Sequence, residues 1–402
     1  MLDLGKTAGS LLGHGPKLQA LLQPVAKFGL RVPRRDPVSS KLREVHGFGS
    51  NPGELRMFVH LPSHLASNSP LVIVLHGCTQ TAEYCHGAGW STLADRYGFA
   101  LVLPEQQRSN NPNLCFNWFQ PEDSKRGQGE ALSIRQMVER TVLDHGIDRR
   151  RVYVTGLSAG GAMTSVMLAT YPDVFAGGAI IAGLPYGAAS NVQEAFETMF
   201  QSPPRPAHEW GKLVRDASAH AGPWPRVSVW HGGADATVIP SNADEIVKQW
   251  TNVHGLAPAP TIENIVDGYP RQVWRTRAGE DLIESYTISD MAHGTPLAVG
   301  NDQDQCGAAG AFLLDVGISS SYHIAKFWGI AATPLIDFNK NTDKSVAAAE
   351  AQSAAHEKPA GRETEALNPA DADPAGASSK IPANIRAVIN QALAAAGLTK
   401  FP

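Results

Sequence analysis

The segment Gly156-Leu157-Ser158-Ala159-Gly160 is the most informative part of this 402-residue chain. It follows the apolar residues Val152-Tyr153-Val154 and precedes the helix-forming run 161–168, so the order is strand, sharp turn, helix. A G-x-S-x-G turn in this setting forces the serine into a strained conformation and exposes its hydroxyl above a sheet edge. Glycines flank the serine because side chains there would collide with the neighbouring strand or helix. Ser158 is therefore a candidate nucleophile.

The pattern around this turn predicts an α/β protein. Continuous apolar runs indicate strands that are covered on both faces. Alternating apolar and polar residues indicate a strand covered on one face, and apolar residues three or four apart indicate helices. Strands that alternate with helices imply parallel strands joined by right-handed crossovers, hence a mostly parallel central sheet with helices on both faces. The predicted strands are 56–61, 71–75, 99–103, 152–154, 178–182, 227–231 and 282–288, and predicted helices include 90–97 and 134–142.

Composition divides the chain into four parts. Residues 1–40 form a weakly amphipathic N-terminal arm, and residues 41–340 carry the predicted α/β domain. Residues 341–380 are rich in Ala, Glu, Asp, Pro and Ser and almost free of large apolar residues, which predicts a flexible linker. Residues 381–402 predict one short amphipathic helix, ending near Gly397. Three roles are open for this helix: it could dock on the domain, bind a partner, or mediate self-association through 381–397.

The bulk numbers exclude several classes of protein. Apolar residues make up 43% and charged residues 18%, with a formal net charge of −4, so no nucleic-acid surface is expected. No apolar run approaches 18 residues, so no transmembrane helix is expected. The N-terminus lacks the basic start and apolar stretch of a standard secretory signal.

The chain has four cysteines and no C-x-x-C pair, which argues against a zinc ribbon. An even number of cysteines fits two disulfides and fits reduced thiols equally well.

Residues 186–222 interrupt the strand and helix rhythm. They contain large apolar residues and Pro203-Pro204. An insertion of this size between core strands commonly sits above the active edge of a sheet. The segment predicts a lid or a wall for an acyl group, with packing of a long crossover as the alternative.

A serine nucleophile needs a carboxylate that orients its base, and this chain offers three candidates. In folds with such a turn, the acid and then the base follow later strands. Asp235 lies in the loop after the predicted strand 227–231, as the order requires. Asp244 falls inside the next predicted helix, and Asp267 precedes Gly268, where a turn role suffices. We therefore predict Asp235 as the acid.

The base must be a histidine on a loop beyond the acid. His293 follows the predicted strand 282–288 and precedes a Gly-Thr-Pro turn that would expose its ring. His254 and His323 lie in or near helical stretches and suit the role less well. We predict that His293 takes the proton of Ser158.

An oxyanion intermediate needs two N–H donors. One is expected from Ala159, directly after the nucleophile, and the other from the loop that follows the early strand 71–75. In that loop the N–H of Cys78 is the natural candidate. Trp118 and Phe119 are expected near the site as substrate-binding residues, although core packing explains either one equally well.

With these residues assembled, the chain resembles the bacterial poly(3-hydroxybutyrate) depolymerase family of esterases over residues 45–330. The matching segments are Leu75-His76-Gly77-Cys78-Thr79-Gln80, Asn117-Trp118-Phe119, 150–163, His231-Gly232-Gly233-Ala234-Asp235-Ala236-Thr237-Val238 and Met291-Ala292-His293-Gly294-Thr295-Pro296. The resemblance implies an α/β-hydrolase fold, a Ser-Asp-His triad, no metal or cofactor, and often secretion. The missing signal weakens the last point, so an extracellular and a cytoplasmic location both stay open.

The resemblance also bears on the cysteines. It places Cys78 at the oxyanion position and implies a disulfide between Cys78 and Cys115 that braces this loop. A second pair, Cys85 with Cys306, is a further implication. A thiol nucleophile at Cys78 is disfavoured, because the loop has no dedicated histidine.

The predicted activity is that of a serine esterase acting on short-chain acyl or 3-hydroxyacyl esters, including polyester oligomers. Residues 341–380 contain no aromatic residue, which disfavours stacking on a crystalline polymer. The alternatives are an acetyl xylan or feruloyl esterase of carbohydrates and, outside enzymes, a polymer granule-binding protein.

Overall fold

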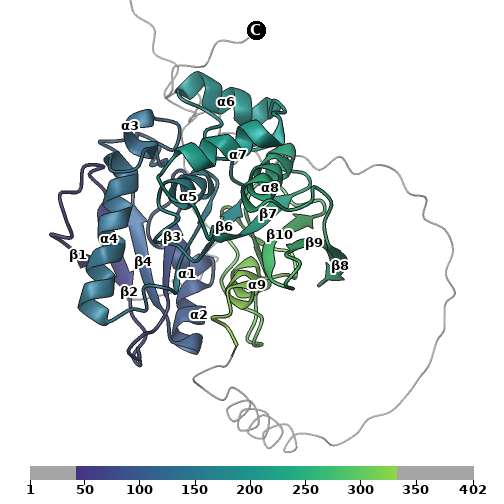
Figure 1. Ribbon diagram of the computed structural model, residues 1–402. Helices are drawn as coiled ribbons and strands as arrows, with labels where there is room; N and C mark the ends of the chain where they lie inside the picture. Colours follow the sequence, from purple (N-terminus) through teal and green to yellow (C-terminus); the bar gives the residue numbers. More distant parts are fainter. Residues whose placement is uncertain (1–41, 333–402) are drawn as a thin grey trace, which may run out of the picture. The chain divides into compact units, whose positions relative to one another are not determined.

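The computed structural model describes residues 42–332, in which ten strands form one sheet. The strand order is β1-β2-β4-β3-β5-β6-β7-β10-β9-β8. The strands from β4 to β10 in this order pair in parallel, whereas β1, β2, β9 and β8 add antiparallel edges (Figure 1). The sheet is therefore mostly parallel, as the sequence predicts.

The elements have the following bounds. The strands are β1 Arg43–Val45, β2 Arg56–His60, β3 Leu71–Leu75, β4 Ala100–Glu105, β5 Val152–Leu157, β6 Gly177–Ile181, β7 Arg226–Gly232, β8 Ile262–Val266, β9 Tyr269–Arg275, β10 Asp281–Ile288, β11 Thr295–Leu297 and β12 Leu313–Asp315. The helices are α1 Tyr84–Gly87, α2 Trp90–Tyr97, α3 Pro121–Ser124, α4 Gly129–His145, α5 Ala159–Thr170, α6 Val192–Gln201, α7 Ala207–Asp216, α8 Ser241–His254 and α9 Ser320–Phe327.

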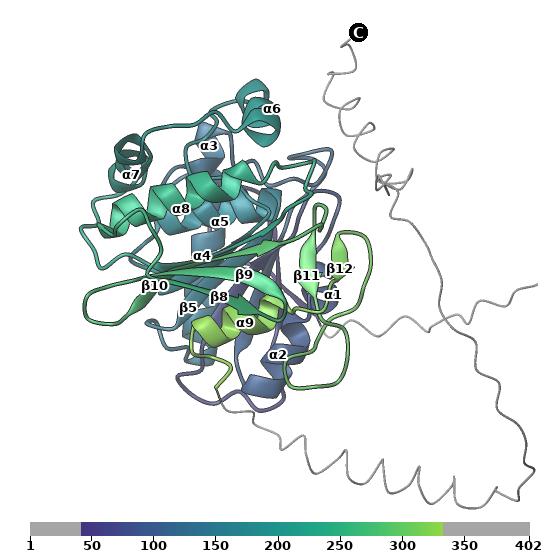
Figure 2. The same ribbon diagram turned by 90° about the vertical axis from the view of Figure 1, so that its right-hand side faces the viewer.

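Each face of the sheet has its own apolar core. Along β3, Leu71, Ile73 and Leu75 pack into one core with residues of α4, α5 and α8. Val72 and Val74 of the same strand pack into the other with residues of α2 and α9. Figure 2 shows α5 and α8 on one side of the sheet and α2 and α9 on the other. This double burial explains why the central strands are continuous apolar runs.

Some elements carry no clear signal in the sequence. The predicted last strand, 282–288, is followed by two more, β11 and β12, which are three residues long and too short to show a period. The hairpin of β8 and β9 lies at the sheet edge, where β8 is half-exposed or exposed throughout and lacks an apolar run. Asp267 occupies the turn of this hairpin with φ +48°, in line with the turn role expected for it.

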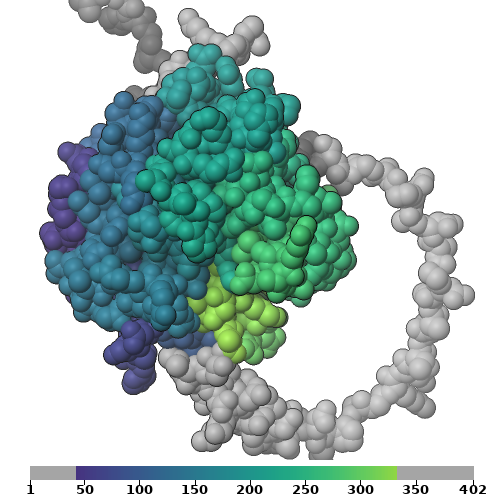
Figure 3. All heavy atoms as spheres, in the orientation of Figure 1, coloured from purple at the N-terminus to yellow at the C-terminus, as the bar shows by residue number. Residues whose placement is uncertain are grey.

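The insertion 186–222 forms α6 and α7. Helix α7 packs on α8 through Trp210, whose indole N–H donates a 2.5 Å hydrogen bond to Glu245. Helix α6 lies on the outer side of α8, and Asn242 near the start of α8 donates to the Thr198 carbonyl of α6 at 3.0 Å (Figures 1 and 2). In the space-filling view of Figure 3, the teal residues of this segment gather at the top of the molecule.

Three of the four predicted parts of the chain cannot be compared with the structure. The arm 1–40, the linker 341–380 and the helix within 381–402 lie outside the described residues. Among residues 42–332, no helix has the length and apolar character that crossing a bilayer requires.

Candidate active site

The predicted site residues follow the carboxyl ends of four strands that run parallel. Ser158 comes after β5, Cys78 after β3, Asp235 after β7 and His293 after β10. The carboxyl ends of parallel strands meet at one edge of the sheet, where open α/β sheets bind their ligands. Residues that are far apart in the sequence are thereby brought to one edge.

The turn at Ser158 has the strain expected of a nucleophile elbow. Ser158 has φ +58° and ψ −118°, a conformation that costs a non-glycine residue on the order of 1–3 kcal/mol. Its flanking glycines are required by close packing. A Cβ on Gly156 would lie 2.4 Å from the Gly160 backbone, and a Cβ on Gly160 would lie 2.4 Å from the Leu75 carbonyl oxygen. The colliding neighbours are thus the helix and the strand, as expected.

Asp235 and His293 form a direct hydrogen bond. His293 Nδ1 donates to Asp235 Oδ2 at 2.7 Å, while Oδ1 accepts the backbone N–H groups of Thr237 at 2.8 Å and Val238 at 2.9 Å. Burial by itself raises the pKa of Asp235, but the interactions of the carboxylate with His293 and His231 outweigh burial and hold that pKa well below the ordinary 3.8. The carboxylate is thus ionised and can fix the imidazole so that Nε2 remains for another partner.

Ser158 and His293 line the same cavity, whose volume is about 340 Å³. Its lining includes both polar and apolar residues. The polar ones include Thr79, Gln80, Asn111, Asn113 and Thr237. The apolar ones include Trp118, Phe119, Leu157, Leu184, Val192, Ala195, Phe196, Met199 and Phe200.

Trp118 and Phe119 lie both at the cavity and in the apolar core. They line the cavity, and they also pack with the main apolar core, in which Trp118 is buried. Their rings meet edge to face at 5.4 Å. Each is thus a packed core residue whose ring reaches the cavity.

The backbone N–H groups of Cys78 and Ala159 differ from their neighbours in hydrogen bonding. Neighbouring N–H groups are engaged: Gly77 donates to the Gln80 side chain, Thr79 to the Asn113 carbonyl and Ser158 to the Ile181 carbonyl. Within residues 42–332 the N–H groups of Cys78 and Ala159 donate to no protein acceptor. Both residues line the cavity beside Ser158, so these two donors are available to an oxyanion.

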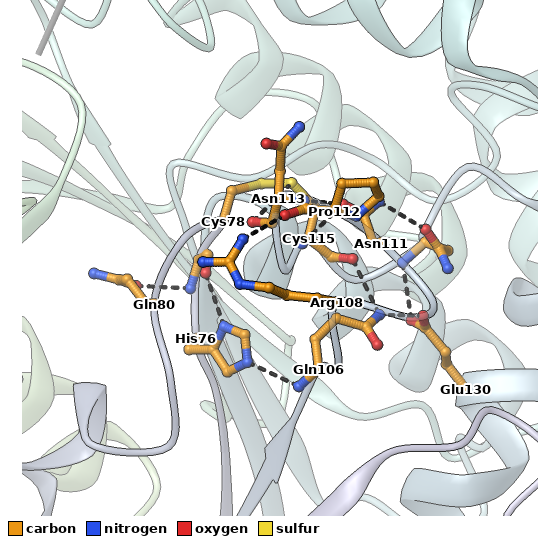
Figure 4. The surroundings of a disulfide bond; sticks show 12 residues. His76, Cys78, Gln80, Gln106, Arg108, Asn111, Pro112, Asn113, Cys115 and Glu130 are labelled. Atoms are coloured by element: carbon orange, nitrogen blue, oxygen red, sulfur yellow. Dashed lines mark hydrogen bonds between the residues drawn. A yellow bond between two sulfur atoms is a disulfide. The ribbon is translucent and has the colours of Figure 1, made fainter. Parts of the chain in front are cut away.

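A disulfide braces the Cys78 loop. Cys78 is bonded to Cys115, as the resemblance implies, and Thr79 N–H donates to the Asn113 carbonyl at 2.7 Å (Figure 4). The second implied pair is absent. Cys85 and Cys306 are free and buried, and the Cys306 thiol lies 3.2 Å from the Ser319 hydroxyl.

A chain of buried polar groups supports the same loop from below. His76 Nε2 accepts the Gln106 N–H at 3.1 Å, and Gln106 Nε2 donates to Glu130 Oε1 at 2.5 Å (Figure 4). Burial lowers the pKa of His76 to about 4, so its ring is neutral and Nε2 can accept. Burial, with the nearby Asp123 charge, raises the pKa of Glu130 to about 8. Glu130 Oε2 also accepts the Asn117 N–H at 2.9 Å and so anchors the segment before Trp118.

Sequence reasoning missed two residues beside the candidate acid and base. The His231 ring is buried at the end of β7, donates from Nε2 to the Val238 carbonyl at 2.8 Å, and lies 3.4 Å from Asp235 Oδ2. The sequence signal that could have identified His231 is its position four residues before Asp235, at the end of the predicted strand 227–231. Phe312 packs its ring edge to face with His293 at 6.0 Å and adopts φ +60°, for which no local pattern exists.

The competing candidates lie elsewhere. Asp244 is inside α8, His254 ends α8 and donates to the Pro225 carbonyl, and His323 in α9 pairs with Asp267. None of these residues lines the cavity of Ser158. Over the described range, no three His, Cys, Asp or Glu side chains converge in a geometry suited to a metal ion.

Known proteins match this chain closely. The family model described as "Esterase PHB depolymerase" matches residues 55–266. Poly(3-hydroxyalkanoate) depolymerase C of Paucimonas lemoignei is 51% identical over 290 residues, which cover 72% of this chain and 70% of that protein. Acetylxylan esterase A of Emericella nidulans is 35% identical over 278 residues, which cover 66% and 89%.

A solved structure agrees with these matches. The acetyl xylan esterase from Aspergillus awamori superimposes with a TM-score of 0.61 at 27% identity, covering 72% of this chain and 99% of that one. The chain thus shares its overall fold with an esterase of solved structure. The chain belongs to the esterase PHB depolymerase family, and the protein is a carboxylic ester hydrolase of the α/β-hydrolase fold.

Proposed function

We propose that this esterase cleaves short-chain 3-hydroxyacyl esters, including those of polyester oligomers, with Ser158 as nucleophile, His293 as base and Asp235 as the orienting acid. The observation that carries the proposal is the 2.7 Å bond from His293 Nδ1 to Asp235 Oδ2, at a cavity that also contains the strained Ser158. The 51% identity to a poly(3-hydroxyalkanoate) depolymerase supports the substrate class.

Acylation follows from the roles of these groups. Ser158 Oγ forms a bond to the ester carbonyl carbon as its proton passes to His293 Nε2. The carbonyl oxygen gains negative charge, which the N–H groups of Cys78 and Ala159 stabilise. Each such donor contributes about 3 kcal/mol to lowering the barrier. The bond from carbon to the alcohol oxygen then breaks, and His293 returns its proton to the leaving alcohol.

Deacylation repeats these steps with water. His293 Nε2 accepts a proton from water as the water oxygen bonds to the acyl carbon, and the bond to Ser158 Oγ then breaks. The proton returns to Ser158, and a carboxylic acid leaves. Asp235 stays ionised throughout because its pKa is held well below the ordinary value.

The direct test replaces the nucleophile. Ser158→Ala should reduce kcat on p-nitrophenyl butyrate by about 10⁴-fold or more, while the unfolding temperature changes little. Ser165→Ala, a buried hydroxyl on α5 outside the cavity, is the matched control and should keep kcat near that of wild type. Near-wild-type hydrolysis by Ser158→Ala would disprove the assignment.

A second candidate substrate class has support from two polar residues that line the cavity. The Asn113 amide and Gln80 Nε2, both of cavity-lining residues, could bind sugar hydroxyls, whereas the Asn111 amide is already bonded to Asn117, Asn113 and Cys115. Relatives named acetylxylan and feruloyl esterases also match the chain. Parallel kcat/KM values on 3-hydroxybutyrate oligomers, acetylated xylan and methyl ferulate would separate the classes. The proposal expects the oligomers to be hydrolysed with the highest efficiency.

A further inference from the structure

One face of α6 is apolar and turned to the cavity. Val192, Phe196, Met199 and Phe200 occupy positions i, i+4, i+7 and i+8 of this helix, and all four line the cavity that contains Ser158. Positions at this spacing share one side of a helix. The residues Gln193, Glu194, Glu197 and Gln201, by contrast, do not line the cavity. The helix therefore separates a polar outer face from an apolar face directed at the site.

Part of this apolar face is exposed to solvent and is not buried in the core. Val192 is 39% exposed and Phe200 is 41% exposed, and both belong to the few large apolar residues exposed within residues 42–332. The rings of Phe196 and Phe200 stack at 6.1 Å with an interplanar angle of 8°. Adjoining apolar side chains that line a cavity and remain partly exposed are typical of a ligand-binding groove.

The helix is fixed in place at its carboxyl end. Asn242 donates from Nδ2 to the Thr198 carbonyl at 3.0 Å, and Ile239 N–H donates to the Met199 carbonyl at 2.9 Å. Asn242 and Ile239 belong to the segment that continues from the Asp235 loop. The apolar face is thus held at a set position relative to the candidate acid, as a wall of the site.

The length of this wall exceeds what a monoester needs. From Val192 to Phe200 the helix rises about 12 Å, at roughly 1.5 Å per residue. An extended peptide residue has three main-chain atoms and is about 3.5 Å long. A 3-hydroxybutyryl unit has four main-chain atoms. Each unit therefore spans roughly 5 Å by the same scaling. The wall is long enough for two units, whereas an acetyl group would contact only a small part of it.

We propose that Phe196 and Phe200 form an aromatic ledge that binds the ester unit next to the scissile one, so that α6 sets a preference for oligomeric 3-hydroxyacyl esters over monoesters. This inference rests on the proposed function and adds a determinant of chain length to it. A polysaccharide fits the ledge less well, because the side chains that α6 presents to the cavity are all apolar and leave sugar hydroxyls without partners.

The test compares substrates of increasing length on five proteins. Phe200→Ala and Phe196→Ala/Phe200→Ala are measured beside the wild type, with Leu143→Ala as the matched control. Leu143 is an apolar residue of α4 that is 68% exposed and lies outside the cavity. The substrates are p-nitrophenyl acetate, methyl ferulate and the dimer, trimer and tetramer of 3-hydroxybutyrate. Phe196→Leu/Phe200→Leu is included to restore apolar contact.

The ledge predicts a selective loss. In the double variant, kcat/KM on the trimer and tetramer should fall about tenfold or more, as expected for lost apolar contacts in a binding site. Hydrolysis of p-nitrophenyl acetate should stay within twofold, the leucine variant should recover part of the loss, and Leu143→Ala should match the wild type.

Three results would overturn the inference while leaving the esterase assignment intact. They are an equal loss on all substrates, no loss on any, or a loss confined to an aromatic ester such as methyl ferulate. Failure of the wild type to hydrolyse 3-hydroxybutyrate oligomers at any length, with activity retained on p-nitrophenyl acetate, would instead refute the proposed substrate class and the ledge with it.

Discussion

Asp235 and His293, 58 residues apart in the chain, meet through a 2.7 Å hydrogen bond between Oδ2 and Nδ1. The contact arises because β7 and β10 are parallel neighbours in the sheet, so the loops that follow them start side by side. The carboxylate is buried and satisfied by two backbone N–H groups at Oδ1, which leaves Oδ2 to the imidazole.

The first prediction concerns this bond. Asp235→Asn keeps the shape of the side chain but removes its charge, and an amide that donates to Nδ1 stabilises the wrong tautomer of His293. We expect kcat on p-nitrophenyl butyrate to fall about 10⁴-fold. Asp244→Asn, on α8 outside the cavity, serves as the control and should leave kcat unchanged. Comparable kcat values for the two variants would argue against Asp235 as the acid.

The second prediction concerns His231. Its Nε2–H ties the Val238 carbonyl and approaches Asp235, so His231→Ala should loosen the acid loop and lower kcat by roughly tenfold to a hundredfold. His231→Gln, which retains an N–H donor, should recover part of the rate.

His254 provides the matched comparison. It is also a histidine that donates to a carbonyl, that of Pro225, but it does not line the cavity. His254→Ala should lower the unfolding temperature without a specific loss of kcat. If both alanine variants lose rate only in proportion to stability, His231 has no positioning role.

The third prediction concerns the disulfide between Cys78 and Cys115. It closes a loop with a sequence separation of 37, and the chain-entropy relation assigns such a cross-link about 4 kcal/mol of stability. Cys78→Ser/Cys115→Ser should lower the free energy of unfolding in urea by a few kcal/mol and reduce kcat, because the Cys78 N–H loses its brace. A reducing agent should destabilise the wild type but not the double variant. Equal urea midpoints for the two proteins would contradict the expectation.

The fourth prediction concerns Glu130 and pH. Burial raises its pKa in the folded protein to about 8 from the ordinary 4.5. Between these pH values the folded state binds more protons than the unfolded state, so this carboxyl makes stability fall as pH rises.

Glu130→Gln should remove that contribution. We expect the difference in unfolding free energy between variant and wild type to shift in favour of the variant as pH rises from 5 to 8, measured by urea denaturation at each pH. Glu122→Gln, an exposed carboxyl of α3, should follow the wild type. A difference that is constant with pH would show that Glu130 does not titrate in this range.

Much of this architecture follows from local sequence pattern. The apolar runs at β3, β5 and β7 exist because these strands are covered on both faces, and the same runs locate the loops of Cys78, Ser158 and Asp235. The G-x-S-x-G segment predicts its turn from local sequence. Positions 156 and 160 require glycine because a Cβ there would collide with the same strand-turn-helix unit or with the neighbouring β3.

Other features depend on contacts that no local pattern records. Whether Cys85 meets Cys306 depends on how two distant segments pack, and the structure keeps these thiols apart. Phe312 lies between the short strands β11 and β12, has a positive φ itself, and packs its ring against His293. The apolar positions of α6 indicate an amphipathic helix, but only the packing of α6 against the loop of Ile239 turns its apolar face to Ser158.

The central claim is that the Ser158 hydroxyl is the attacking group. Treating the wild-type protein with diethyl p-nitrophenyl phosphate, followed by peptide mass spectrometry, tests it most directly, because the reagent phosphorylates activated serines. The account predicts a single diethylphosphoryl adduct on Ser158, formed in proportion to the loss of esterase activity and absent from Asp235→Asn on the same timescale. An adduct on another residue that tracks the loss of activity, or full activity with Ser158 modified, would contradict it.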